Sequence, residues 1–387
     1  MSSGRSASRR GLRVAVTGPT GDIGRSLLRA LDRSRDVEAV VGMARRPFDP
    51  AAEGLRKTTY QQGNVLDRES TMGLVEGADV LVHSMRPQKI AALGFAPEAV
   101  CRRHPRIIYA GLHGYRNGGP YSGQPAYDDV IQAQTGIAAL MAPIAGEPRY
   151  APMIVADKTC ALTAANAITA ALFARERTGR GQFVEIPMLE TMAAFVLTEH
   201  LFGHTFVPPE GSPGYSRVLA PWRRPYRTAD GRICMLAYTD AQWRRFWQAA
   251  GQPEMMDDPR FADLAARTRH IDDVYRLAGE ALAGRTSREW LALLDKLEIP
   301  AGPVNALEDL PDDPHLAAIG FFRHVRHPSE GEIVMPDIPL RFSQSPGDIS
   351  RLPPGFGEHG REVLGEIGLS TAEIDALAAS GALVLPD

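Results

Sequence analysis

Asp157 is the residue whose type and position most clearly suggest chemistry. It follows the apolar run Tyr150–Ala156 and precedes a small-residue helix predicted over Lys158–Arg177, which Thr178-Gly179-Arg180-Gly181 closes. The unpaired N–H groups and the positive dipole end of such a helix would hold a carboxylate ionised and pointing outward. Asp157 is therefore predicted to be a nucleophile or, alternatively, only the N-cap of the helix, because Asp is among the preferred capping residues.

Several further sequence blocks occur in a fixed order around Asp157. They are Gly77-Ala78-Asp79-Val80-Leu81-Val82, Met85-Arg86-Pro87, His104-Pro105-Arg106-Ile107-Ile108-Tyr109, Gly118-Gly119-Pro120-Tyr121, Ala126-Tyr127-Asp128, Gln132-Ala133, Thr135-Gly136, Val155-Ala156-Asp157, the stretch 174–182, Thr228-Ala229-Asp230-Gly231, the stretch 299–305 and Gly357-Glu358-His359. Taken together, this series over residues 77–387 resembles the family III CoA-transferases, also called the CaiB/BaiF family.

The resemblance implies an acyl-CoA:carboxylate CoA-transferase with CoA as a substrate. Asp157 would attack the acyl-CoA carbonyl and form an anhydride, which returning thiolate converts into an enzyme–CoA thioester. Backbone N–H groups must then hold the developing oxyanion, either at Gly118 and Gly119 or at Lys158 and Thr159. The remaining positions that match the family's CoA pocket are Arg86, Lys89, Tyr127, Asp128 and Met188.

The segment 11–76 has a different pattern. A short strand, Leu12–Thr17, precedes Gly18, Gly21 and Gly24, a helix predicted over Arg25–Arg33 follows, and a second strand covers Val37–Met43. Such a glycine loop lets the backbone approach a pyrophosphate at a helix N-terminus. The spacing resembles NAD(P)-dependent epimerases of the extended short-chain dehydrogenases, and Arg45 with Arg46 would favour NADP over NAD.

Hydride chemistry nevertheless lacks its acid–base pair in this chain. The dehydrogenases use a Tyr with a Lys four residues later, and none of the lysines, Lys57, Lys89, Lys158 and Lys296, has that spacing. The sequence therefore predicts a hybrid chain, in which an epimerase-like segment at 11–76 precedes a CoA-transferase-like part at 77–387. This chain is expected to need no metal and to bind CoA, with NADP possible but disfavoured. Two alternatives stay open: an α-methylacyl-CoA racemase, disfavoured because Tyr127 replaces its second base, and a catalytically impaired binder of NADP or CoA.

Composition and charge are those of a large globular enzyme. The chain has 387 residues, 44% hydrophobic and 23% charged, with a formal net charge of −3, which gives no reason to expect nucleic acid or membrane partners. Three cysteines are too few for a disulfide framework and favour a cytoplasmic location. Residues 1–10 read as a disordered tail, and the longest apolar stretch, Ala161–Ala174, is too short to span a bilayer.

Alternating strand and helix patterns predict an α/β fold. We expect a doubly wound, Rossmann-like large domain built from N- and C-terminal segments, plus a smaller α+β domain. The predicted parts are 11–76 (epimerase-like unit), 77–204 (large domain), 205–225 (linker), 226–298 (small domain) and 299–387 (return to the large domain). His200 and His204 are expected to pack at a helix end, and Trp243, Phe246 and Trp247 to face a core. The resemblance further implies a homodimer.

Overall fold

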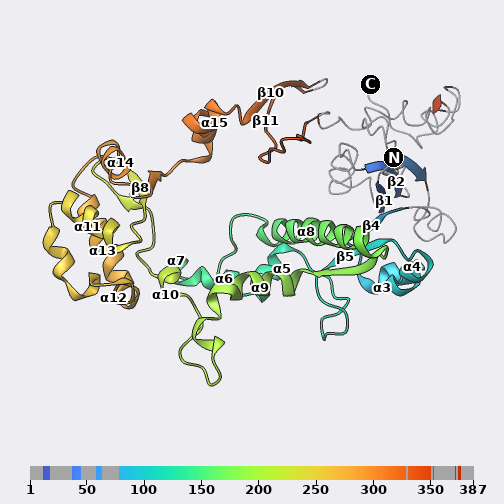
Figure 1. The fold of residues 1–387 in the computed structure, drawn as a ribbon, viewed down its shortest axis with the longest axis horizontal. Coiled ribbons are helices and arrows are strands. Elements are labelled where there is room, and N and C mark those ends of the chain that lie inside the picture. The colour runs from blue at the N-terminus through green and yellow to red at the C-terminus, as the bar shows by residue number, and fades with distance from the viewer. Residues whose placement is uncertain are drawn as a thin grey trace, which may run out of the picture. The chain divides into compact units, whose positions relative to one another are not determined.

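A computed structural model describes residues 12–17, 37–44, 58–62, 78–327 and 330–349, with four further positions at 352, 371, 374 and 375. The chain divides into two compact units. Unit 1 comprises Met1–Gln134, Ile154–Met192 and Ala318–Asp387, and unit 2 comprises Thr135–Met153 and Ala193–Ala317 (Figure 1). The glycine loop at Gly18, Gly21 and Gly24, Arg45 and Arg46, the helix predicted over 25–33 and the block at 357–359 lie outside the described residues.

Unit 1 is built on a six-stranded sheet in the order β3-β2-β1-β4-β5-β6. Every neighbouring pair is parallel. The strands are β1 (Leu12–Thr17), β2 (Val37–Ala44), β3 (Thr58–Gln62), β4 (Val80–His83), β5 (Ile108–His113) and β6 (Gln182–Pro187). This is the strand order of a doubly wound dinucleotide fold, so the predicted fold class is confirmed.

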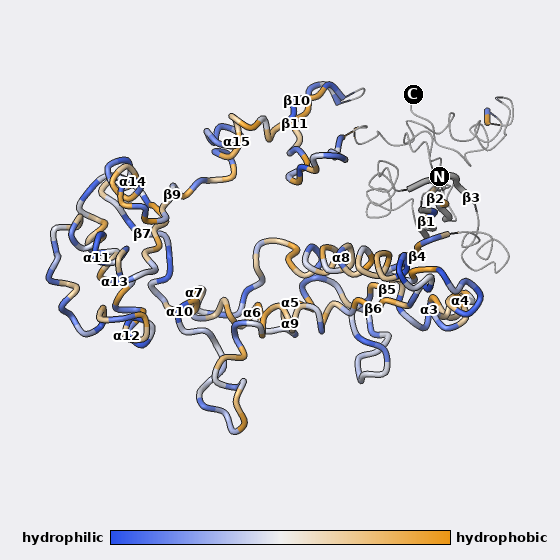
Figure 2. Tube along the Cα trace, in the orientation of Figure 1, coloured by the Kyte–Doolittle hydropathy of each residue, from blue (hydrophilic) through white to orange (hydrophobic). Residues whose placement is uncertain are grey.

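Helices cover both faces of this sheet. One face packs Leu81 and Tyr109 against Ile90 of α3 (Pro87–Ala92) and Val100 of α4 (Pro97–Arg103). The opposite face packs alternate strand residues against α8 (Val155–Thr178), whose small apolar residues Ala164 and Ala171 allow close approach. Figure 2 shows hydrophobic residues recurring along α8 and the strands beside it.

Helix α8 is the longest described helix of the chain and sets the geometry of unit 1. Its last residue is Thr178, and its C-cap is Gly179, whose φ of 73° is the left-handed conformation that glycine adopts readily, as the predicted closing sequence requires. It begins at Val155, three residues before the predicted start. The remaining described helices and strands of unit 1, some of them shared with unit 2, are α5 (Asp128–Gln134), α9 (Met188–His200), β10 (Phe322–His327) and β11 (Gly331–Pro336).

Unit 2 has its own sheet and its own aromatic core. Strands β7 (Tyr226–Arg227), β8 (Arg232–Met235) and β9 (Ala301–Pro303) pair antiparallel, and Asp230-Gly231 forms the predicted hairpin turn. Trp243, Phe246 and Trp247 of α11 (Asp240–Ala249) are buried, which confirms the predicted core face. The other helices of unit 2 are α6 (Ile137–Leu140), α7 (Ala142–Ala145), α10 (Ser216–Leu219), α12 (Leu264–Arg269), α13 (Ile271–Leu282) and α14 (Ser287–Lys296). Helix α15 (Pro314–Ala318) begins in unit 2 and ends in unit 1. Short 3-10 turns cover Phe202–Thr205, Pro253–Asp257, Pro259–Phe261 and Leu307–Asp312.

Candidate active site at the start of helix α8

Asp157 lies in the first turn of α8 but does not cap it. The N-cap position is Ile154, which has no side-chain capping bond, and Asp157 is the third helical residue. The interpretation of Asp157 as an N-cap is therefore wrong. The side chain of Asp157 is exposed. The N–H groups at the start of α8 are therefore capped by a residue from another part of the chain.

Asp128, the first residue of α5, supplies that cap. Its Oδ1 accepts hydrogen bonds from the backbone N–H groups of Ala156, at 2.7 Å, and of Asp157, at 3.1 Å. Its Oδ2 accepts from the side-chain amide of Gln132. Asp128 is only 6% exposed, so this carboxylate is committed to holding the backbone of Asp157. Two of the free N–H groups at the start of α8 are satisfied in this way.

The two carboxylates affect one another electrostatically. Partial burial raises the pKa of Asp157 above its ordinary value, and the negative charge of Asp128 raises it further. These effects act against the helix dipole, which the sequence predicts to keep Asp157 ionised. Burial, with Asp157 and Asp128 adding to it, raises the pKa of Cys160 to about 11, so this thiol one turn along stays protonated at neutral pH and is not a competing nucleophile.

The topology of the sheet places Asp157 at the edge where parallel α/β proteins bind ligands. Strands β5 and β6 are parallel neighbours, so α8, which precedes β6, must run back from the carboxyl ends of the strands to their amino ends. Its first turn therefore lies at the carboxyl edge of the sheet, outside which ligands bind in this class of fold.

A glycine turn follows β5 at the same edge. Gly118 has a φ of 85°, and neither Gly118 nor Gly119 donates a backbone hydrogen bond to any residue that the structure describes. By contrast, the N–H of Lys158 donates to the carbonyl of Ile154 at 3.2 Å. Of the two predicted sets of oxyanion donors, the glycine turn is the one whose amides remain available.

The other predicted pocket residues lie near strand ends. Arg86 follows β4, and its Nη1 is 3.5 Å from the carbonyl of Gly123. Lys89 is exposed on α3 and has no ion pair within the described part of the chain. Tyr127 is 80% exposed immediately before Asp128, and Met188 starts α9 directly after β6. Arg86 and Met188 thus lie just beyond the carboxyl ends of β4 and β6.

Three polar residues that the sequence interpretation did not select lie at this edge as well. His83 ends β4, His113 ends β5, and Glu185 lies on β6. His113 Nε2 is 3.0 Å from Glu185 Oε1, and both histidines are buried. The signal available in the sequence was a histidine ending each of two short apolar runs.

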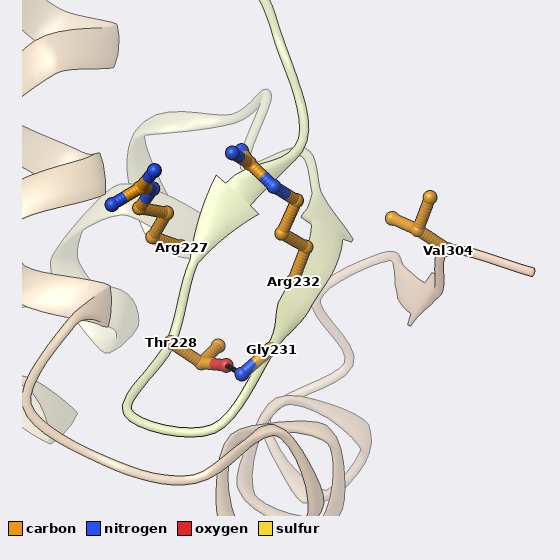
Figure 3. Close-up of a pocket in the computed structure, with 5 residues that line it drawn as sticks. All are labelled: Arg227, Thr228, Gly231, Arg232 and Val304. Atoms are coloured by element: carbon orange, nitrogen blue, oxygen red, sulfur yellow. Dashed lines mark hydrogen bonds between the residues drawn. The ribbon is translucent and has the colours of Figure 1, made fainter.

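Unit 2 carries a separate open depression, of about 520 Å³, lined by Arg227, Thr228, Gly231, Arg232 and Val304 (Figure 3). The hydroxyl of Thr228 already accepts from the N–H of Gly231 at 3.0 Å and contacts Ser287 at 2.8 Å. The depression therefore offers a ligand two guanidinium groups and an apolar side chain but no nucleophile.

Neither a metal centre nor a membrane span is found in the part of the chain that the structure describes. Within the described ranges, no three His, Cys, Asp or Glu side chains are arranged to hold a metal ion. Among the same residues, every helix is too short or too polar to cross a bilayer.

Comparison with known proteins agrees with this architecture. The model of CoA-transferase family III matches residues 28–360, so the chain belongs to that family. The match begins at residue 28, inside the segment 11–76 for which the sequence predicts an epimerase-like unit.

Individual relatives extend over most of the chain. A formyl-CoA:oxalate CoA-transferase of Streptomyces avermitilis is 29% identical over 394 residues, covering 96% of this chain and 92% of that protein. A succinate–glutarate CoA-transferase of Agrobacterium fabrum is 29% identical over 299 residues, covering 76% and 74%. The crystal structure of Rv3272 from M. tuberculosis superposes with a TM-score of 0.72 at 25% identity, covering 91% of this chain and 98% of that one.

Proposed function

We propose that this CoA-transferase moves CoA from an acyl-CoA to a free carboxylic acid through covalent intermediates on Asp157. The observation that carries the proposal is the exposed Asp157 carboxylate, whose backbone Asp128 fixes at the carboxyl edge of the sheet. An exposed carboxylate on a fixed backbone can reach a bound thioester without the loss of orientation that a mobile nucleophile suffers.

The reaction runs in two halves. Asp157 attacks the acyl-CoA carbonyl, the C–S bond breaks and CoA leaves as thiolate, giving a mixed anhydride. The thiolate then attacks the aspartyl carbonyl of the anhydride, which releases the donor acid as carboxylate and leaves Asp157 as a CoA thioester. The acceptor carboxylate attacks this thioester, and the same steps in reverse give the new acyl-CoA and free Asp157.

Each step passes through a tetrahedral oxyanion. We assign its stabilisation to the amides of Gly118 and Gly119, since the N–H of Lys158, in the alternative pair, already donates to the carbonyl of Ile154. A well-placed donor of this kind contributes about 3 kcal/mol to lowering the barrier. Arg86 and Lys89 would hold phosphate groups of CoA, which suit guanidinium and ammonium donors, while Tyr127 and Met188 would contact the rest of the ligand.

The relatives suggest a substrate class and a biological setting. Because their names pair formyl-CoA with oxalate and succinate with glutarate, we propose small mono- or dicarboxylic acids as donor and acceptor. We also propose a homodimer in the cytoplasm, where Cys101, Cys160 and Cys234 would remain the free thiols that they are here. The resemblance of residues 11–76 to an epimerase remains a proposal about the origin of that segment.

The decisive experiment replaces Asp157. Asp157→Asn should reduce CoA exchange at least about 1000-fold, because the amide is not a nucleophile, whereas Asp129→Asn, which alters the neighbouring exposed carboxylate on α5, should stay close to the parent. Exchange would be followed with formyl-CoA plus oxalate and succinyl-CoA plus glutarate, and hydroxylamine trapping with mass spectrometry would locate the adduct. Full activity of Asp157→Asn would refute the proposal.

A further inference from the structure

A polar row crosses the carboxyl edge of the central sheet. In the strand register His83 lies opposite Gly111, and Gly111 lies opposite Glu185. Side chains opposite one another point to the same face, so this row follows directly on the apolar row of Leu81, Tyr109 and Phe183. His113 extends the row by one step along β5, two residues after Gly111.

His113 and Glu185 form a buried pair in this row. His113 Nε2 is 3.0 Å from Glu185 Oε1, and the His113 side chain is only 4% exposed. Because the carboxylate accepts, Nε2 carries the hydrogen and the orientation of the imidazole is fixed. The other ring nitrogen, Nδ1, is buried and has no hydrogen-bond partner among the described residues.

Glu185 also holds the backbone that leads into the glycine turn. The same Oε1 accepts from the N–H of Asn117 at 2.7 Å. The neighbouring N–H, of Arg116, donates to Glu190 Oε1 at 3.2 Å. Two carboxylates, one on β6 and one on α9, therefore fix the two residues that precede Gly118, and only Glu185 is itself held by a buried side chain.

His83 provides the neutral neighbour of this pair. Burial, with the nearby His113 adding to it, lowers the pKa of His83 to about 4, so the ring is uncharged at neutral pH. Its Nδ1 accepts from the N–H of Met85 at 3.1 Å. A Cβ at position 111 would lie 3.2 Å from His83 Nε2, so the glycine leaves room for the ring beside β5.

We propose that His113 and Glu185 are positioning residues for CoA transfer, which hold the turn from Arg116 to Gly119 so that its free amides meet the oxyanion formed at Asp157. The inference rests on the proposed function and deepens it. The two ends of the loop that contains this turn lie close together, because a Cβ at Gly114 would overlap that of Ala126. Asp128, which accepts from the N–H of Asp157, follows Ala126 by two residues, so the loop leads directly to the residue that holds Asp157.

The test separates positioning from folding. His113→Leu should lower kcat about 100-fold while KM for acyl-CoA changes little, because the misplaced amides act on the transition state. His113→Gln, which can still donate to Glu185, should recover most of the rate. The matched control, His324→Ala, alters an exposed histidine on β10 and should leave both constants unchanged.

Each outcome of these measurements either supports the positioning role of His113 and Glu185 or contradicts it. An unchanged kcat in His113→Leu, or a loss that merely follows the folded fraction measured by circular dichroism and is not rescued by Gln, would overturn the inference. If His113→Leu does not fold, Glu185→Gln takes its place, since Gln keeps the shape and the acceptor for the N–H of Asn117 but loses the charge that orients His113. A wild-type kcat in Glu185→Gln would contradict the inference. Absence of any Asp157 adduct in the parent enzyme would instead count against the proposed function.

Discussion

At the residue scale, the site depends on a carboxylate that binds no substrate in our proposal. Asp128 accepts from two backbone N–H groups of α8 and places a negative charge beside Asp157. The first effect fixes the position of the nucleophile. The second raises its pKa, so the fraction of reactive carboxylate begins to fall at a higher pH than for an ordinary aspartate.

Asp128→Asn separates these two effects. The amide oxygen can still accept from Ala156 and Asp157, but the charge is gone, so the pKa of Asp157 should fall towards its ordinary value. Because Asp157 must be ionised to attack, the acid limb of the kcat/KM profile should move to lower pH, with little change near neutrality. Asp128→Ala should in addition lose about 1 kcal/mol of folding free energy, as other lost helix caps do. An unmoved acid limb in Asp128→Asn would contradict this account.

At the element scale, α8 is fixed at its other end by Arg175. This residue is 2% exposed, forms a 2.9 Å ion pair with Asp79 just before β4, and donates to the carbonyls of Asp79 and Arg106 at 3.2 Å each. One guanidinium group thus ties the C-terminal half of α8 to the amino ends of β4 and β5. Asp157 is carried at the opposite end of the same helix.

Removal of this anchor should be costly. We expect Arg175→Ala to lower the free energy of unfolding by about 3 kcal/mol, the lower end for broken buried pairs, since Asp79 keeps partial contact with water. Arg175→Lys keeps the charge but not the planar fork, so it should lie between the parent and Arg175→Ala. Urea unfolding would measure all three, with Arg177→Ala, an exposed arginine on the same helix, as control. Equal midpoints for Arg175→Ala and the control would be inconsistent with the anchor.

At the scale of the whole molecule, two units carry separate cores. Unit 1 packs helices on a parallel sheet, whereas unit 2 packs α11, α13 and α14 around Trp247, Trp290 and Phe261. A parallel sheet of this order is shared by enzymes that bind dinucleotides and by this family, so the architecture alone does not choose between CoA and NADP.

Ligand-dependent melting of the full chain makes that choice. CoA at a hundred times its Kd should add about 2.7 kcal/mol to stability and raise the melting temperature. NADP at the same concentration should add little, because the chain belongs to CoA-transferase family III and has no Tyr-Lys pair with which to use a bound nicotinamide. Arg86→Gln should weaken the shift with CoA. A shift with NADP but none with CoA would instead favour the non-catalytic dinucleotide binder.

Local signals in the sequence determined much of this protein. Strand β1 covers the predicted residues, the Asp230-Gly231 turn joins β7 to β8, and Gly179 ends α8 as expected, because each depends on backbone preferences within a few neighbouring residues. The ordered motifs also indicated the family that the comparison with known proteins shows.

Only the tertiary structure determined which residues hold Asp157, the turn from Arg116 to Gly119 and the far end of α8 in place. The cap comes from Asp128, 29 residues away, the partner of His113 is 72 residues away, and Arg175 meets a carbonyl 96 residues away. No local pattern encodes such pairs, because they arise only when the parallel sheet and the helices packed on it bring together residues that are distant in sequence, at the carboxyl edge for Asp157 and His113 and at the amino edge for Arg175. A buried polar group then takes whichever partner the packing puts within reach, since leaving it unpaired would cost more.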